Sequence, residues 1–111
     1  EHVDNNFNPM PKIYVDEYRP VREKISGLMQ RTEAMLSTTR FDEYDAVLGE
    51  ADALKDELSV IRKHHYDRMQ SDHDVSNLKI SLVYLNILQE SQEFLSIMRH
   101  QLRAANRFYG N

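Results

Sequence analysis

VSNLKISLVYLNILQESQEFLSIMRHQLRAANRF, residues 75–108, decides the fold, because it predicts one long helix with a broad apolar face. The stretch contains no proline or glycine, and at about 1.5 Å per residue it would be about 50 Å long. Its apolar residues form two neighbouring stripes, whereas a helix that packs on one neighbour needs an apolar arc of only about 100°. We therefore expect the central helix of a bundle, with two partners. The stripes are Leu78, Leu82, Leu85, Leu95, Leu102 and Ala105, interrupted by Gln92, and Ile80, Val83, Tyr84, Ile87, Phe94 and Met98.

Length and composition exclude several classes of protein. With 111 residues the chain can form one domain with a real core, and its net charge of -4 argues against general nucleic-acid binding. It has no cysteine, which excludes a disulfide framework and a thiolate metal site. No apolar stretch approaches the roughly 18 residues of a membrane span. Because the chain begins at Glu1 and not at a methionine, we expect it to be an excised piece of a longer protein.

Residues 1–19 are predicted to form an extended arm or linker. All three prolines, Pro9, Pro11 and Pro20, lie among the first 20 residues next to several asparagines, a composition that is typical of linkers. Four residues of the second half could hold the arm against the rest of the protein: Ile13, Tyr14, Val15 and Tyr18. The folded domain is then expected at residues 20–111.

Three helices are predicted within this domain. Pro20 suits the first turn of a helix, where its missing N–H costs nothing, and apolar residues then recur three and four apart up to residue 36. The second helix is expected over residues 40–69, with Thr39 as its N-cap and an acid three positions later. Residues 75–108 form the third. Short connections favour antiparallel packing, so the predicted fold class is all-α, an antiparallel three-helix bundle with a long C-terminal helix.

Charge is distributed unevenly along the second predicted helix. Its first half is strongly acidic, and the last helix carries Arg99, Arg103 and Arg107, spaced four apart on one face. Antiparallel packing would place this arginine stripe beside the acids, so we expect interhelix ion pairs that set the register of the helices. The acids are Asp42, Glu43, Asp45, Glu50, Asp52, Asp56 and Glu57.

Two kinds of side chain could bind metal, and neither pattern predicts a site. Glu50, Asp52 and Asp56 lie on one helix and offer oxygen ligands for a hard cation, but a solvated or arginine-paired face is the simpler interpretation. A di-iron bundle requires a Glu-x-x-His motif. No glutamate stands three residues before any of four histidines, His64, His65, His73 and His100.

No catalytic machinery is predicted. The chain has no cysteine, no Gly-x-Ser-x-Gly motif and no phosphate-binding glycine-rich loop, since its three glycines are far apart. Carboxylates on an open helix face also lack the enclosed pocket that would shift their pKa values apart. We therefore expect a protein that is not an enzyme, with no catalytic residue, no cofactor and no metal site.

Two polar features of the last helix have a structural and a functional interpretation. The arginine stripe with His100 has the charge to bind phosphate groups or an anionic membrane surface, but pairing with the acids of the second helix is favoured. Ser91 and Gln92 interrupt the apolar stripes midway. A polar layer that fixes helix register is favoured there over a docking or ligand-binding spot.

The sequence YLNILQE at residues 84–90 is similar to the last helix of PhoU-like domains, in particular those that follow the membrane part of bacterial sodium-dependent phosphate cotransporters. An acid-x-x-x-Asp motif of the same family is matched by Asp52 and Asp56. The resemblance covers about residues 21–108. Tyr84, Leu85, Ile87, Leu88 and Glu90 match the family pattern, with Phe94 at an isoleucine position, whereas Asn86, Ser91 and Glu93 depart from it.

The resemblance implies a PhoU-type three-helix unit with a regulatory or gating role. It would be a non-catalytic cytoplasmic domain of a sodium-dependent inorganic phosphate transporter, at the cytoplasmic face of the bacterial inner membrane. The implied partner is the membrane-embedded transporter portion of the same chain. A homodimer is compatible with this role, and nucleic acid is not expected. Regulators of this type hold a metal cluster with acids on two helices, and only Asp52, Asp56 and Glu90 correspond here.

Two other functions are consistent with the sequence. A free-standing helical module would use the broad apolar arc of residues 75–108 as a docking face for another protein. A metal-binding regulator of a phosphate regulon would use Asp52, Asp56 and Glu90 as ligands. All three functions predict the same three-helix fold, so the fold alone does not separate them.

Overall fold

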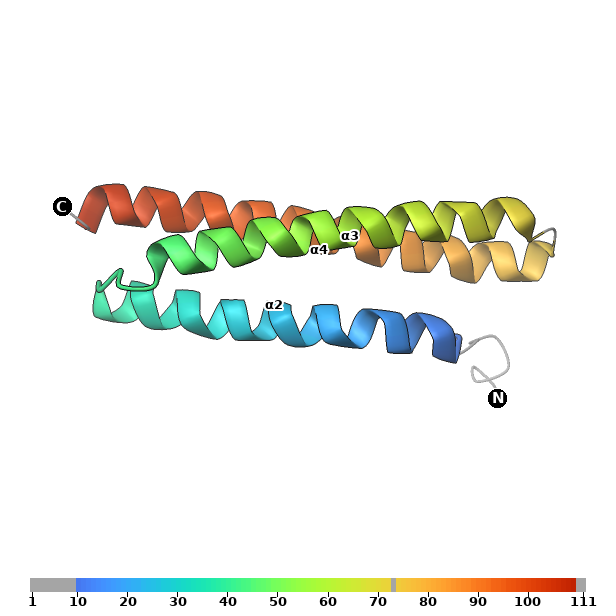
Figure 1. Cartoon of the computed structure of the whole chain (residues 1–111), viewed down its shortest axis with the longest axis horizontal. Coiled ribbons are helices and arrows are strands. Elements are labelled where there is room, and N and C mark those ends of the chain that lie inside the picture. Colours follow the sequence, from blue (N-terminus) through green and yellow to red (C-terminus); the bar gives the residue numbers. More distant parts are fainter. Residues whose placement is uncertain (1–9, 73, 110–111) are drawn as a thin grey trace, which may run out of the picture.

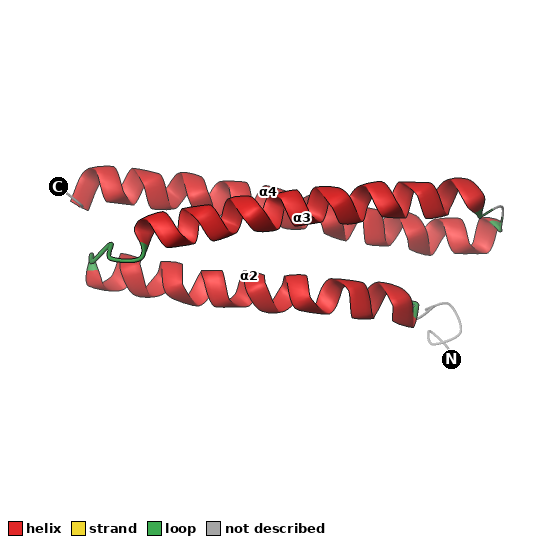
Figure 2. Ribbon diagram, in the orientation of Figure 1, coloured by secondary structure: helices red, strands yellow, loops and turns green. Residues whose placement is uncertain are grey.

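The computed structural model describes residues 10–72 and 74–109 of the chain and consists of three helices (Figures 1 and 2). Helix α2 is Lys12–Thr38, α3 is Tyr44–Ser71 and α4 is Val75–Tyr109. No strand occurs among the described residues, and none of their helices is long and apolar enough to cross a membrane. The predicted all-α three-helix bundle is therefore confirmed.

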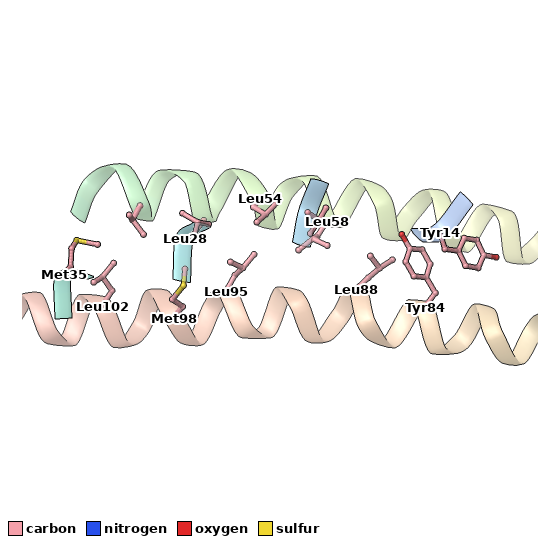
Figure 3. Close-up of a cluster of buried hydrophobic side chains, with 13 residues drawn as sticks. Tyr14, Leu28, Met35, Leu54, Leu58, Tyr84, Leu88, Leu95, Met98 and Leu102 are labelled. Atoms are coloured by element: carbon pink, nitrogen blue, oxygen red, sulfur yellow. The ribbon is translucent and has the colours of Figure 1, made fainter. Parts of the chain in front are cut away.

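The three helices run up, down and up, so that α2 and α4 are parallel to each other and antiparallel to α3 (Figure 1). Each helix contacts both of the others, and α4 packs most extensively on α3. The aromatic ring of Tyr14 in α2 stacks on that of Tyr84 in α4 near one end of the bundle, while Met35 and Leu102 lie in the core near the other (Figure 3). The molecule is consequently a rod of 55 × 34 × 19 Å.

The core runs along the rod because each helix repeats apolar residues at heptad-like spacing. On α2 the core residues recur every seven positions, and on α4 they are mostly three or four apart, which is the periodicity of helices that pack side by side at a small angle. The residues of the core cluster are Tyr14, Val21, Leu28 and Met35 of α2, Val47, Ala51, Leu54 and Leu58 of α3, and Tyr84, Leu88, Leu95, Met98 and Leu102 of α4.

The arm predicted for residues 1–19 is wrong in its second half, because residues 12–19 form the first two turns of α2. Residues 1–9 lie outside the described part of the chain. The helix start that the sequence suggested at Pro20 lies instead at Pro11, whose carbonyl oxygen accepts hydrogen bonds from two amide groups of the first turn. The folded domain therefore begins earlier than residue 20.

Pro20 is accommodated inside α2 although a proline there removes one backbone hydrogen bond. The turns that precede it are held by contacts with the other two helices. Tyr14 is buried and stacks on Tyr84, and the carboxylate of Glu17 accepts a hydrogen bond of 3.0 Å from Arg68 of α3. Tertiary packing thus outweighs the local tendency of proline to end a helix.

The connection between α2 and α3 is longer than predicted, because α3 begins at Tyr44 and not near Arg40. Thr39 is not an N-cap. It follows the last residue of α2 in the left-handed conformation, with φ of 55°, and the Thr38 hydroxyl accepts a hydrogen bond from the amide of Arg40. The threonines therefore satisfy the end of one helix and do not start the next.

The prediction that the last helix needs two neighbours is confirmed, since α4 contacts both α2 and α3. These neighbours nevertheless leave part of its apolar arc uncovered. Leu78 and Leu82 are exposed on one side of the helix, and Val83 and Phe94 are exposed on the other. The second of these exposed sides forms part of the candidate site.

Candidate functional site

Two of the acids considered as metal ligands are bound to arginines of other helices. Glu50 of α3 lies 2.7 Å from Arg31 of α2, and Asp52 of α3 lies 2.8 Å from Arg99 of α4. Asp56 is exposed. Glu50 and Asp52 thus lie on the arginine-paired face that we predicted from the sequence, and each of the two carboxylates has a cationic partner.

The acids suggested by the PhoU-like resemblance do not come together. Glu90 lies exposed on α4, where its carboxylate accepts a hydrogen bond of 3.2 Å from the amide of Asn86, one turn earlier on the same helix. Among the described residues, no three histidine, cysteine, aspartate or glutamate side chains form a group that could hold a metal ion. Within residues 10–72 and 74–109, Asp52, Asp56 and Glu90 therefore do not form a metal-binding cluster.

The arginine stripe of α4 pairs with α3 through one of its members. Arg99 binds Asp52 as predicted. Arg103 and Arg107 are exposed and form no ion pair with the residues that the structure describes, and His100 is exposed as well. The stripe is therefore partly a scaffold and partly a solvated basic surface near the end of the rod.

The acids of α3 and of its N-cap pair mainly with α2, an arrangement that was not predicted from the sequence. Lys24 lies 3.0 Å from Glu57, and Arg31 lies 2.7 Å from both Glu43 and Glu50. A signal was present, because Lys24 and Arg31 are seven residues apart and so share one face of α2. Exposed pairs of this kind contribute little energy each, and they align α2 lengthwise against α3.

Gln92 joins α4 to α3, as the polar-layer interpretation predicted. Its amide nitrogen donates to the carbonyl oxygen of Lys55 at 3.0 Å and to the hydroxyl of Ser59 at 2.8 Å. Its amide oxygen accepts a hydrogen bond of 2.7 Å from Arg62. These hydrogen bonds use both polar groups of the Gln92 side chain and fix the register of α4 against α3.

Ser91 makes the corresponding link between α4 and α2. Its hydroxyl donates to the carbonyl oxygen of Ile87 at 2.8 Å, and it therefore accepts the hydrogen bond from the hydroxyl of Tyr18. Ser91 and Gln92 thus form one polar layer that touches both neighbours of α4, in agreement with the prediction. The hydrogen bond between Tyr18 and Ser91 places these two residues at the same level along the axis of the bundle.

A partly buried polar cluster lies where the start of α2 meets the end of α3. We call it the His65 cluster, and it consists of Tyr14, Glu17, His65, Arg68 and Tyr84. The His65 ring is fully buried and lies edge-on to the stacked rings of Tyr14 and Tyr84. The Glu17 carboxylate accepts hydrogen bonds from Arg68 at 3.0 Å and from the Tyr84 hydroxyl at 2.7 Å. Of the other histidines considered, His64 is exposed and His73 lies outside the described residues.

The hydrogen bonds of His65 assign its tautomer. Its Nε2 lies 2.8 Å from the carbonyl oxygen of Ser81, which can only accept, so Nε2 carries the proton. Its Nδ1 then accepts the hydrogen bond of 3.0 Å from Arg68. Burial lowers the pKa of His65 and the nearby Arg68 charge lowers it further, although the hydrogen bond to Ser81 opposes this. His65 is therefore a neutral imidazole with both nitrogens in use.

The carboxylate and the phenol of the cluster are also held in fixed charge states. Burial would raise the pKa of Glu17, but the hydrogen bonds from Arg68 and Tyr84 and the charge of Arg68 lower it below its ordinary value. Burial and the neighbouring Glu17 carboxylate raise the pKa of the Tyr84 phenol. Since these hydrogen bonds join α2, α3 and α4, the cluster stabilises the bundle. Sequence reasoning missed it because its members come from three helices and share no spacing.

A second heptad stripe on α4 lies beside the core stripe and is mostly exposed, and we call it the outer seam. Its residues alternate three and four apart, which is the spacing that helices use to pack on one another. Ile97 is 56% exposed and Phe108 is 78% exposed. The outer seam consists of Ile80, Val83, Ile87, Glu90, Phe94, Ile97, Gln101, Ala104 and Phe108.

Helix α2 borders the outer seam and extends its apolar surface. A hollow of about 230 Å³ lies between α2 and α4, and Val15, Arg22 and Ile87 are among its lining residues. Val15, Arg22, Met29 and Leu36 recur every seven residues along α2, and the three apolar members of this row are exposed. The outer seam and this row of α2 together form the apolar surface that the broad arc of the last helix predicted.

No protein family, curated protein or solved structure matches this chain. The candidate function therefore rests on the geometry of the outer seam and on the sequence resemblance stated above.

Proposed function

We propose that this chain is a non-catalytic helical interaction domain that binds another helix along the outer seam. The observation that carries the proposal is a heptad stripe over residues 80–108 that is mostly exposed although it has the pattern of a packed one. Only Ile80, which packs against the core, and Ile87 are partly buried. Isolated apolar residues on a surface need no explanation, but a row of apolar residues at packing spacing is characteristic of an interface, even where Glu90 and Gln101 interrupt it.

The polar clusters of the molecule are consistent with a structural role. The His65 cluster has a buried centre with Glu17 and Arg68 partly exposed, and its charged groups hydrogen-bond other members of the cluster. The polar layer of Ser91 and Gln92 is used to join the helices. Most of the outer seam is left exposed by the packing of residues 10–72 and 74–109, and we therefore place the function on this surface.

Photocrosslinking in cells that produce the protein would test this proposal. A benzoylphenylalanine replaces Ile97 in the outer seam, and in a matched control it replaces Val60 of α3, since the two side chains are 56% and 57% exposed. We expect a discrete crosslinked protein from position 97 and none from position 60. Crosslinks from neither position, or equally from both, would contradict an interaction through the outer seam.

A more specific form of this function follows from the PhoU-like resemblance. We propose that the interaction domain belongs to a sodium-dependent phosphate transporter and regulates or gates it at the cytoplasmic face of a bacterial inner membrane. The similarity of residues 84–90 to the last PhoU-like helix supports this, and the three-helix order is compatible with it. The coding sequence upstream of Glu1 provides the test. Several apolar spans of about 20 residues each would support the proposal, and a start codon directly before Glu1 would contradict it.

A further inference from the structure

We propose that the helix that binds the outer seam is α4 of a second copy of this chain, placed by a two-fold axis perpendicular to the rod. This inference rests on the proposed interaction function and names its partner. In such a dimer the two α4 helices pack antiparallel at the centre, and each also lies beside α2 of the other copy.

The bundle leaves a position for an antiparallel helix beside α2 and α4. These two helices are parallel to each other, and the hollow of about 230 Å³ lies between them. A helix seated in this position completes an up-down-up-down arrangement when it runs antiparallel to both. A two-fold axis perpendicular to α4 produces this direction, because it reverses the helix that it copies.

One charged layer interrupts the apolar surface, and it contains one charge of each sign. Arg22 lies one turn after Tyr18, and Glu90 lies one residue before Ser91. Because Tyr18 contacts Ser91 and the two helices are parallel, the two charges lie about 7.5 Å, or one and a half turns, apart along the rod. Arg22 forms no ion pair with the described residues, and Glu90 accepts a hydrogen bond from Asn86 of its own helix.

This charged layer is matched by a second copy of the chain and not by a helix with charges of one sign. An acidic helix would satisfy Arg22 but repel Glu90, and a basic helix would do the opposite. A two-fold axis through this layer places Arg22 of each copy beside Glu90 of the other copy. Both charges are then paired by the same symmetry operation, which is the reciprocity of an isologous interface.

The apolar layers fit the same register. An axis between Glu90 and Phe94 sets Ile87 against Ile97 of the second copy on one side of the charged layer, and the same pair recurs on the other side. Further out, Val83 lies opposite Gln101 of the second copy. The interface is closed by its own symmetry, so the outer seam is covered in both copies and no growing filament forms.

Sedimentation equilibrium of the 111-residue chain tests the dimer directly, and Ile97→Glu tests its location. We expect a reversible monomer–dimer equilibrium for the wild type, and a monomer with unchanged helical circular dichroism for I97E. A wild type that stays monomeric up to about 1 mM, a range that reaches weak complexes, would overturn the proposal. So would an I97E variant that dimerises as the wild type does.

Charge reversal tests the reciprocal pairing. We expect Arg22→Glu and Glu90→Arg each to raise the dissociation constant of the homodimer by about tenfold or more, because each places like charges opposite each other twice. A mixture of R22E and E90R chains should form heterodimers with near wild-type affinity, since both contacts become attractive again. The controls are Arg103→Glu on α4 and Glu23→Arg on α2, which change net charge equally at exposed positions outside the outer seam. A mixture that remains dissociated would overturn the two-fold register.

The two proposals can fail separately. Photocrosslinks from position 97 to a protein of another mass, with no crosslinked dimer of this chain, would retain the interaction domain and overturn the second copy as its partner. Absence of any crosslink from position 97 would overturn the interaction function itself. A crosslinked species of twice the chain mass would support both.

Discussion

His65 is a side chain whose charge state depends on the packing of three helices. Its ring is enclosed by two tyrosines, it donates to the backbone of α4, and it accepts a hydrogen bond from Arg68. Adding a proton to Nδ1 would replace this acceptor with a donor and would place a second positive charge beside the guanidinium. The folded state therefore favours the neutral imidazole.

Stability should consequently fall as the pH is lowered below neutrality. The pKa of His65 is lower in the folded chain than its ordinary value of about 6.5, so below that pH the unfolded chain binds a proton that the folded chain does not. The free energy of unfolding, measured with urea at several pH values between about 7.5 and 5.5, should decrease over this window. His65→Gln should show a smaller decrease, and an equal decrease in the variant would contradict the assignment. Below about pH 4.5, Glu17 should add a further loss, because its pKa is also lowered.

Thr32 is buried in the core, and its hydroxyl has no hydrogen-bond partner among the described residues. Thr32→Val replaces this hydroxyl with a methyl group of similar shape, so we expect the free energy of unfolding to rise by about 1 kcal/mol. Thr32→Ser is the control, because it keeps the hydroxyl and removes the methyl group, and it should lower stability. Denaturation with urea measures both, and a destabilising T32V would show that the hydroxyl is satisfied in solution.

At the scale of the helices, Gly49 is a weak point of α3. It lies within the helix at an exposed position, and no atom lies within 4 Å of the place where a Cβ would be added. Gly49→Ala should therefore raise the free energy of unfolding by up to about 1 kcal/mol through helix propensity and reduced chain entropy. Thermal melting followed by circular dichroism measures this, and an unchanged melting temperature would mean that the position is frayed in solution.

The helices were predictable to different degrees, for physical reasons. Helix α4 was predicted closely because its residues contain no breaker and its apolar periodicity is continuous. The start of α2 was missed because Pro20 is a strong local signal, while the burial of Tyr14 that outweighs it is a contact with residues far along the chain. The site was predictable only as a broad apolar arc. Its division into a buried stripe and an outer seam depends on where α2 and α3 lie.

For the whole molecule, two positions on α4 separate the role of the core from that of the outer seam. Leu95 is fully buried among residues of all three helices, and Ile97 lies two positions later in the outer seam. Leu95→Ala should lower the free energy of unfolding by about 2–5 kcal/mol, whereas Ile97→Ala should change it by less than about 0.5 kcal/mol. Urea denaturation at a concentration where the chain is monomeric measures both. Similar losses at the two positions would mean that α4 is packed differently.

The parallel course of α2 and α4 has a mechanical consequence. The start of α2 and the end of α4 lie at opposite ends of a rod 55 Å long, with α3 returning between them (Figure 1). A pulling force applied through Lys12 and Tyr109 therefore acts along the helix axes and loads the packed layers in shear. The polar layer and the interhelix ion pairs then resist the load together, so the domain should extend little before it unfolds when tension is applied along it.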